Sequence, residues 1–178
     1  MKYIFDFDRV LFNTSLFITG HIYPAFAELG VSKEEINRYF KEKGLKHFSL
    51  KGLIKNFSLE DGLYTRIMSG CKTLVNEDLI ALVKRLGKEN CYMLTFGEHE
   101  FQKEKIDRSG IADLFSEIFI VPNSKADVLR KICARHKDET VIFLDDKEEH
   151  FKGLGDIPNL RTILFDEQGL AKLRLEMQ

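Results

Sequence analysis

An apolar run that ends in two carboxylates opens the chain and restricts the possible fold more than any other feature. Residues 3–7 are aromatic or β-branched except for Asp6, a composition typical of a buried strand. Buried parallel strands are apolar throughout, so Asp6 and Asp8, which point roughly the same way, repel each other at a costly position. Mg²⁺ removes this cost, and it typically binds one or two carboxylates together with phosphate oxygens. Taken alone, Asp6 and Asp8 could instead cap a turn through their side chains. The rest of the chain favours the metal site.

Length and composition point to one α/β domain with an insert. The chain has 178 residues, of which 44% are hydrophobic and 31% charged, enough to bury a substantial core. Its net charge of -1 gives no indication of nucleic-acid binding. Cys71, Cys91 and Cys133 have no zinc-site spacing and are expected to be reduced and buried. Because we find no apolar run of membrane-spanning length and no room for a signal peptide, the expected location is the cytoplasm, without membrane contact.

Strand and helix patterns alternate along the second half of the chain. Strands are predicted at 91–95, 117–121, 140–144 and 161–165, and helices at 98–109, 124–136, 147–154 and from 167 onward. Such alternation is typical of a parallel sheet with helices on both faces, joined by right-handed crossovers. Together with the first strand, the pattern predicts a Rossmann-like α/β fold built on a parallel five-stranded sheet.

The segment between the first two predicted strands has helical patterns only. Helices are predicted at 15–29, 33–43, 48–57 and 60–74, followed by one at 77–86 that returns to the sheet. A polar break at 13–15, a capping box of Ser32 and Glu35, and Asn76 supply N-caps, while Gly44 ends a helix. We therefore expect a core domain of residues 1–14 and 72–178 and a small all-helical subdomain of residues 15–71.

Side chains that could take part in catalysis or metal binding stand at four places, each at the end of a strand or at the start of the next helix. They are Asp6 with Asp8, Thr95, Lys125, and Asp145 with Asp146. In a parallel sheet these ends lie on one edge, where open α/β sheets bind ligands. Several carboxylates, a hydroxyl and a fixed cation suit a phosphate and a Mg²⁺ ion held side by side.

Taken in order, these residues resemble the motifs of the haloacid dehalogenase-like hydrolase superfamily. Residues 6–11 resemble its first motif, Thr95 its second, Lys125 its third, and Asp145 with Asp146 its fourth. The match runs from Lys2 to about residue 164. It implies a phosphatase-type member with a helical cap inserted between the first and second motifs, in the position of residues 15–71.

The resemblance implies a role for each matching residue near the reacting phosphoryl group. Asp6 would be the nucleophile that forms an aspartyl-phosphate, and Asp8 the general acid and then the base that activates water. Thr95 would donate a hydrogen bond to a phosphoryl oxygen. The backbone amides of Phe96 and Gly97 would contribute to substrate binding.

The same resemblance implies a cation and a metal site beside the nucleophile. Lys125 would neutralise charge on Asp6 and on the phosphoryl group. Mg²⁺ would bind Asp6, the backbone carbonyl of Asp8, and the acids of the fourth motif, with Asp146 favoured over Asp145 as the direct ligand. The presence of Asp8 favours phosphoryl transfer over dehalogenation.

Two residues depart from the family pattern, and several others remain open. Arg9 stands where relatives have a small or polar residue, and it either reaches an anionic substrate or, as we favour, lies in solvent. His150 either supports the metal site or, as we favour, caps a loop. Side chains of the helical insert that could meet a substrate, although a lone histidine is more often packed or solvated, are His21, Tyr23, His47 and Lys51.

The sequence therefore predicts a Mg²⁺-dependent phosphatase that hydrolyses a small phosphorylated metabolite. A phosphomutase would use the same nucleophile, since only the acceptor of the phosphoryl group differs. A third hypothesis, an idle binding protein with this fold, is disfavoured because such a protein has no need of all these residues. The motifs name neither the substrate nor the oligomeric state.

Overall fold

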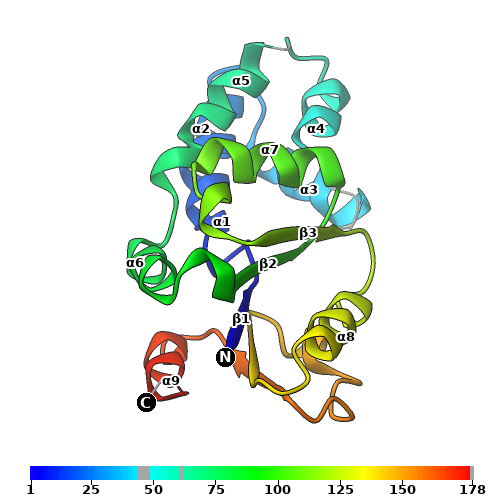
Figure 1. Ribbon diagram of the computed structural model, residues 1–178. Helices are drawn as coiled ribbons and strands as arrows, with labels where there is room; N and C mark the ends of the chain where they lie inside the picture. Colours follow the sequence, from blue (N-terminus) through cyan, green and yellow to red (C-terminus); the bar gives the residue numbers. More distant parts are fainter. Residues whose placement is uncertain (44–48, 61, 177–178) are drawn as a thin grey trace.

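The computed structural model describes residues 1–43, 49–60 and 62–176, shown in Figure 1. Three expectations fall outside these residues and are not taken further. They are the helix end at Gly44, the helix start at residue 48, and the candidate substrate contact His47.

A parallel five-stranded sheet in the order β3-β2-β1-β4-β5 forms the centre of the fold. The strands are β1 (Lys2–Phe5), β2 (Cys91–Phe96), β3 (Glu117–Val121), β4 (Val141–Asp145) and β5 (Leu160–Leu164). Phe5 is level with Met93 on one side and with Leu144 on the other, so β1 ends between two neighbouring strand ends. The predicted Rossmann-like fold class is therefore confirmed.

Helices cover both faces of the sheet. They are α6 (Glu77–Leu86), α7 (His99–Ser109), α8 (Ala126–Arg135) and α9 (Gly169–Glu176), with 3-10 turns at Lys88–Asn90, Ala112–Leu114 and Glu148–Phe151. Figure 1 shows α8 on one side of the sheet and α6 with α9 on the other. Because successive side chains of a strand point to opposite faces, Ile4 packs in the core under α8 while Tyr3 and Phe5 pack in the opposite core.

Among its described residues, the segment between β1 and α6 contains helices, turns and two isolated bridges but no strand. It contains α1 (Thr14–Leu16), a π-helix (Phe17–Ile22), α2 (Tyr23–Ala27), α3 (Lys33–Lys43), α4 (Leu50–Asn56), α5 (Gly62–Met68) and a 3-10 turn (Ser69–Thr73). In Figure 1 helices α2 to α5 gather at the top, away from α8 and α9. This segment shares one hydrophobic cluster with the sheet, since Phe26 and Leu50 belong to the same core as Phe5.

The predicted helix at 15–29 is not one regular α-helix, because its middle is a π-helix. The N–H of Tyr23 reaches back five residues to the carbonyl of Ile18. Pro24 follows at the start of α2, and because proline has no N–H it cannot make the α-helical bond four residues back. The expected N-cap is confirmed, since Asn13 accepts a hydrogen bond from the N–H of Leu16 at 2.9 Å.

The predicted capping box at the start of α3 is also confirmed. Ser32 N–H donates to Glu35 Oε2 at 2.8 Å, and Glu35 N–H donates to Ser32 Oγ at 3.3 Å. Ser32→Ala removes the side-chain cap and is expected to lower the free energy of unfolding by about 1 kcal/mol. Urea unfolding against Glu34→Ala, an exposed change in the same turn, measures this. Equal unfolding free energies for the two variants would show that the cap contributes nothing.

All three cysteines are free and buried, as predicted. None of the helices within the described ranges combines the length and the apolar character needed to span a membrane.

Candidate active site

A buried lysine bridges two carboxylates at the carboxyl edge of the sheet. Asp6 follows β1 directly, and Asp145 is the last residue of β4, the neighbouring strand. Lys125 Nζ lies 2.8 Å from Asp6 Oδ1 and 2.6 Å from Asp145 Oδ2. All three are buried, with Asp6 at 4% exposure, Lys125 at 3% and Asp145 at 0%. Residues from three distant parts of the chain meet here because parallel strands end on one edge and α8 begins beside them.

Burial and charge shift the pKa values of both carboxyl groups. Burial raises the pKa of Asp6 to about 7, although the Lys125 ammonium opposes this and the charge of Asp145 adds to it. Burial also disfavours the ionised form of Asp145, but hydrogen bonds from His150 and Lys125 outweigh it and lower its pKa. One ammonium therefore does not fully compensate the negative charge that the fold gathers here.

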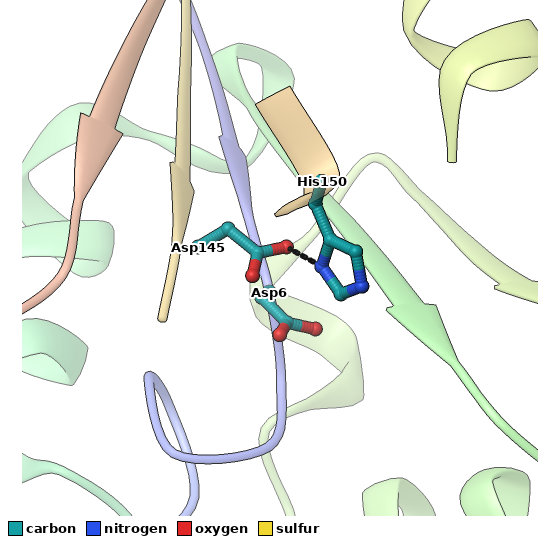
Figure 2. Close-up of side chains that lie close together, drawn as sticks. All are labelled: Asp6, Asp145 and His150. Carbon is teal, nitrogen blue, oxygen red and sulfur yellow. Dashed lines mark hydrogen bonds and ion pairs between the residues drawn. The ribbon is translucent and has the colours of Figure 1, made fainter. Parts of the chain in front are cut away.

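His150 belongs to this cluster, so the expectation that it only caps a loop is wrong. Its Nδ1 lies 2.8 Å from Asp145 Oδ2, and Figure 2 shows the two side chains pointing toward each other beside Asp6. The strand β4 extends to Asp145, one residue further than predicted, and the 3-10 turn Glu148–Phe151 brings His150 back to it. Asp6, Asp145 and His150 each offer one possible metal-ligand atom, and these three atoms lie within 4.8 Å of one another. Within the described residues, this is the cluster of acids and histidines that could hold a metal ion.

Asp146 lies beside this cluster and pairs with Arg9. Arg9 Nη1 is 3.5 Å from Asp146 Oδ2, with the arginine side chain 53% exposed and that of Asp146 12% exposed. The Arg9 side chain is therefore exposed to solvent, as we favoured, and it also lies within ion-pair distance of Asp146. Burial raises the pKa of Asp146, and the charge of Asp145 adds to the shift. Both residues line the same pocket as Asp6.

Thr95 presents a buried hydroxyl without a partner. Its side chain is 0% exposed, and Oγ1 has no hydrogen-bond partner among the residues that the structure describes. An unsatisfied buried hydroxyl costs about 1–3 kcal/mol. Thr95, Phe96 and Gly97 all line the pocket over Asp6, so a polar group bound in this pocket could satisfy the hydroxyl.

Asp8 is held by donors from two helices, which the sequence did not indicate. Its Oδ1 accepts hydrogen bonds from Thr14 Oγ1 and Lys105 Nζ, both at 2.6 Å. Its Oδ2 accepts one from Gln102 Nε2 at 2.7 Å. Gly97 allows the close approach of Gln102, because a Cβ at this position (φ 149°) would lie 2.7 Å from Gln102 Nε2.

Lys105 is the charged partner of Asp8 and is itself buried. Its side chain is 3% exposed and that of Asp8 26%, and Nζ lies 5.0–5.3 Å from the ring centres of Phe7, Phe12 and Phe101. Burial alone would raise the pKa of Asp8, but the Lys105 charge and the three hydrogen bonds outweigh burial and lower it. Asp8 is therefore ionised at neutral pH in this structure.

Lys105→Met should destabilise the protein because it leaves the Asp8 carboxylate without its cation. We expect a loss of about 2–3 kcal/mol, less than for a fully buried pair since Asp8 is partly exposed. Asp8→Asn combined with Lys105→Met should recover most of the loss, because the double variant has no unpaired charge. Denaturant unfolding of the four forms gives the coupling energy. Additive losses in the double variant would show that the ion pair does not carry the effect.

A pocket of about 160 Å³ lies over these side chains. Besides the residues discussed above, the pocket is lined by side chains of the helical segment, of α7 with its N-cap Glu98, and by Lys147 and His150. The helical segment also contains three residues that we considered as substrate contacts, and none of them lines this pocket. They are His21, Tyr23 and Lys51. His21 stacks on Phe17, Tyr23 donates to Asn37, and Lys51 lies over the Tyr64 ring.

Comparison with known proteins identifies the fold. No protein-family model matches the sequence, and no curated protein matches it significantly. A solved structure from Burkholderia xenovorans LB400, named as a haloacid dehalogenase-like hydrolase, superposes with a TM-score of 0.66 at 19% identity, covering 96% of this chain and 89% of that one. The chain has the haloacid dehalogenase-like fold.

Two further structures with the haloacid dehalogenase-like fold match over almost their whole length. The family protein SP0104 from Streptococcus pneumoniae gives a TM-score of 0.60 at 19% identity, covering 99% of this chain and 98% of that one. The hydrolase YfnB from Bacillus subtilis, solved with bound magnesium, gives 0.61 at 14% identity, with the same coverage of 99% and 98%. At such identities the likeness concerns the fold, while the roles of individual residues depend on the geometry described above.

Proposed function

We propose that the chain is a Mg²⁺-dependent phosphatase that hydrolyses a small phosphate monoester through an aspartyl-phosphate on Asp6. The observation that carries the proposal is the unsatisfied, buried Thr95 hydroxyl, which lines one pocket together with Asp6. A phosphoryl oxygen would accept its hydrogen bond. Lys125, whose ammonium lies 2.8 Å from Asp6, supplies positive charge next to the same position.

The donor set fits a magnesium ion. Asp6, Asp145 and Asp146 offer oxygen ligands, which Mg²⁺ prefers. Burial raises the pKa of Asp6 and the charge of Asp145 adds to the shift, so a bound cation would stabilise the ionised form. Asp145 already accepts hydrogen bonds from Lys125, His150 and the N–H of Lys147. Within the described residues, the ion-pair partner of Asp146 is Arg9, at the longer distance of 3.5 Å. We therefore propose Asp146 as the direct ligand, together with Asp6 and the carbonyl of Asp8. The solved YfnB structure contains magnesium in the same fold.

The proposed reaction has two steps that use side chains already in place. A carboxylate oxygen of Asp6 attacks phosphorus, and the bond from phosphorus to the leaving oxygen breaks. The leaving oxygen takes up a proton that the Lys105 ammonium passes on through Asp8. Water then attacks phosphorus while Asp8 takes its proton, which releases inorganic phosphate and restores Asp6. A bound Mg²⁺ would neutralise charge on the phosphoryl oxygens. Asp8 is ionised before the substrate binds because Lys105 lowers its pKa. The proton passed on in the first step therefore comes from Lys105, and the proton taken from water in the second step returns to it through Asp8.

The helical residues 15–71 are proposed to be a cap that closes over the reacting group. Phe17, Ile18 and Ile22 from this segment line the pocket beside Asp6. Residues 1–14 and 72–178 would then form the core domain. The shared hydrophobic cluster indicates that cap and core are packed together in the present conformation.

Phosphatase activity can be tested by phosphate release from p-nitrophenyl phosphate with and without added Mg²⁺. We expect turnover with Mg²⁺ and at least about a 100-fold loss with EDTA. Conversion of a sugar 1-phosphate into its 6-phosphate without phosphate release would instead favour the phosphomutase alternative. Mg²⁺ binding without turnover of any phosphate ester would favour the idle binding protein.

A further inference from the structure

The wall of the pocket opposite the charged residues is apolar. Among the described residues, the apolar side chains that line it are Phe17, Ile18, Ile22, Phe40, Phe96 and Phe101. Phe17 and Ile22 are buried, and Ile18 and Phe40 are partly exposed. Charged side chains line the rest of the pocket, and they include Glu98, Lys105 and Lys147 as well as the acids assigned to the phosphoryl group and the metal. A bound ester would have its phosphoryl group near Asp6 and its leaving group against the apolar side chains.

The π-helix builds a large part of this wall. Phe17 and Ile22 are its first and last residues, and Ile18 accepts the hydrogen bond that closes its wide turn. π-turns occur frequently at functional sites and are otherwise rare. Here the turn brings these three apolar side chains to one pocket, which an α-helix of the same sequence would space differently.

The polar side chains near this wall already have partners within the protein. Both oxygens of Asp8 accept hydrogen bonds, Lys105 donates to Asp8, and Gln102 Nε2 donates to Asp8 and to the carbonyl of Phe96. Two residues that line the pocket have a buried side-chain oxygen without a hydrogen-bond partner among the described residues. These oxygens are Thr95 Oγ1 and Gln102 Oε1. A leaving group with many hydroxyls would lose its bonds to water without replacement, which costs free energy for each group.

The volume of the pocket limits the size of the leaving group. The pocket measures about 160 Å³. A dry cavity of about 150 Å³ lined by Leu, Ile and Phe holds one benzene molecule, whereas sites for drug-sized ligands span about 300–1,000 Å³. Because the same pocket also holds the phosphoryl group beside Asp6, the enclosed space left for the leaving group is no larger than one ring.

From this wall and this volume we propose that the substrate is a phosphate monoester of a small apolar alcohol or phenol, with a leaving group about one ring in size. This inference rests on the proposed phosphatase function and narrows its substrate class. Hydrolysis adds water across the bond between phosphorus and the ester oxygen and gives the free alcohol and inorganic phosphate. Sugar phosphates are poor substrates on this account.

Cyclohexyl phosphate and myo-inositol 1-phosphate provide a matched test, since their rings have the same size and differ by five hydroxyl groups. With Mg²⁺, kcat/KM should be at least about 100-fold higher for cyclohexyl phosphate. Phenyl phosphate should likewise exceed 1-naphthyl phosphate by at least about tenfold. Equal or reversed values within the first pair would overturn the proposal.

A substitution in the apolar wall also tests the proposed preference for apolar leaving groups. Ile18→Asn should lower kcat/KM for cyclohexyl phosphate by about tenfold while leaving the value for myo-inositol 1-phosphate unchanged or higher. Leu16→Asn is the matched control, because Leu16 is 48% exposed and does not line the pocket. Loss of both activities to the same extent in a folded Ile18→Asn protein would contradict the proposal. If circular dichroism shows that this variant is unfolded, the wild-type substrate ratio decides.

Failure of the substrate proposal can be told apart from failure of the phosphatase proposal. Acetyl phosphate, an activated acyl phosphate, serves as a small phosphoryl donor whose acetate leaving group makes few contacts with the wall. If the protein with Mg²⁺ hydrolyses acetyl phosphate and prefers myo-inositol 1-phosphate over cyclohexyl phosphate, only the apolar specificity is wrong. If it hydrolyses none of these esters, the phosphatase function itself is wrong.

Discussion

Asp6→Asn is expected to abolish phosphate release, with a loss of at least about 1,000-fold in kcat. The amide has nearly the same size as the carboxylate, but it offers no nucleophilic oxygen to phosphorus. Asp6 is 4% exposed and lies against Lys125, so no other carboxylate of the site replaces it in the same position. Steady-state rates with p-nitrophenyl phosphate and Mg²⁺ measure the effect.

Asp156→Asn is the control for this variant, because Asp156 pairs with Arg130 on the surface and lies outside the pocket. It should keep wild-type kcat. Retention of more than about a tenth of wild-type turnover by a folded Asp6→Asn protein would remove Asp6 as the nucleophile.

The same substitution gives a pH-dependent change in stability. Burial raises the pKa of Asp6 from its ordinary 3.8 to about 7, so the folded state holds this proton more tightly than the unfolded state. The contribution of Asp6 therefore lowers the free energy of unfolding of the wild type progressively as pH rises from about 4 to about 7. Above about pH 7 this loss stays constant. The stability of Asp6→Asn relative to wild type should increase over this interval, measured by urea unfolding in EDTA. A difference that is flat or falls with pH would contradict the burial argument.

Lys125→Met is expected to cause the largest loss of stability, about 3–5 kcal/mol. The substitution leaves Asp6 and Asp145, with side chains 6% and 0% exposed, without their shared ammonium. For a domain of this size the loss lowers Tm by roughly 10 °C in metal-free buffer. Added Mg²⁺ should restore part of the loss, since it supplies positive charge to the same carboxylates.

Lys103→Met is the matched control for Lys125→Met. Lys103 donates to Asp107 at 2.6 Å, but both side chains are more than half exposed, at 57% and 52%. Such surface pairs contribute less than about 0.5 kcal/mol. Thermal unfolding of both variants makes the comparison. A similar, small shift in each would show that Lys125 does not hold the two carboxylates together.

Local patterns predicted the fold well because the deciding features are short and physically distinct. Each predicted strand occurs within about one residue of its expected position, since apolar runs bounded by polar breaks leave few alternatives. The order of these strands along the chain also placed Asp6, Lys125 and Asp145 on one edge, and the structure brings them within hydrogen-bond distance. The departures lie among the helices. The helix predicted at 15–29 contains a π-helix, the one predicted at 60–74 ends in a 3-10 turn, and the one predicted at 147–154 is the 3-10 turn Glu148–Phe151.

The missed residues depend on tertiary packing, which a single sequence does not display. Gln102 and Lys105 look like exposed positions of an ordinary polar helix, yet α7 turns them inward to hold Asp8. One signal was available, because Gln102, Lys105 and Ser109 recur at helical spacing next to Phe101 and Ile106. His150 was misjudged since its contact with Asp145 depends on the exact end of β4.

The central claim is that the fold assembles a phosphoryl-accepting carboxylate from Asp6, with Thr95 and Lys125 around it. Its most direct test is an acid-quenched single turnover of phenyl phosphate with Mg²⁺, followed by mass spectrometry of the protein and its peptides. The account predicts one transient phosphoryl group on the peptide that contains Asp6, removed by hydroxylamine as expected for an acyl phosphate. Phosphate release without any phosphoryl group on that peptide, or with the group on another residue, would contradict it.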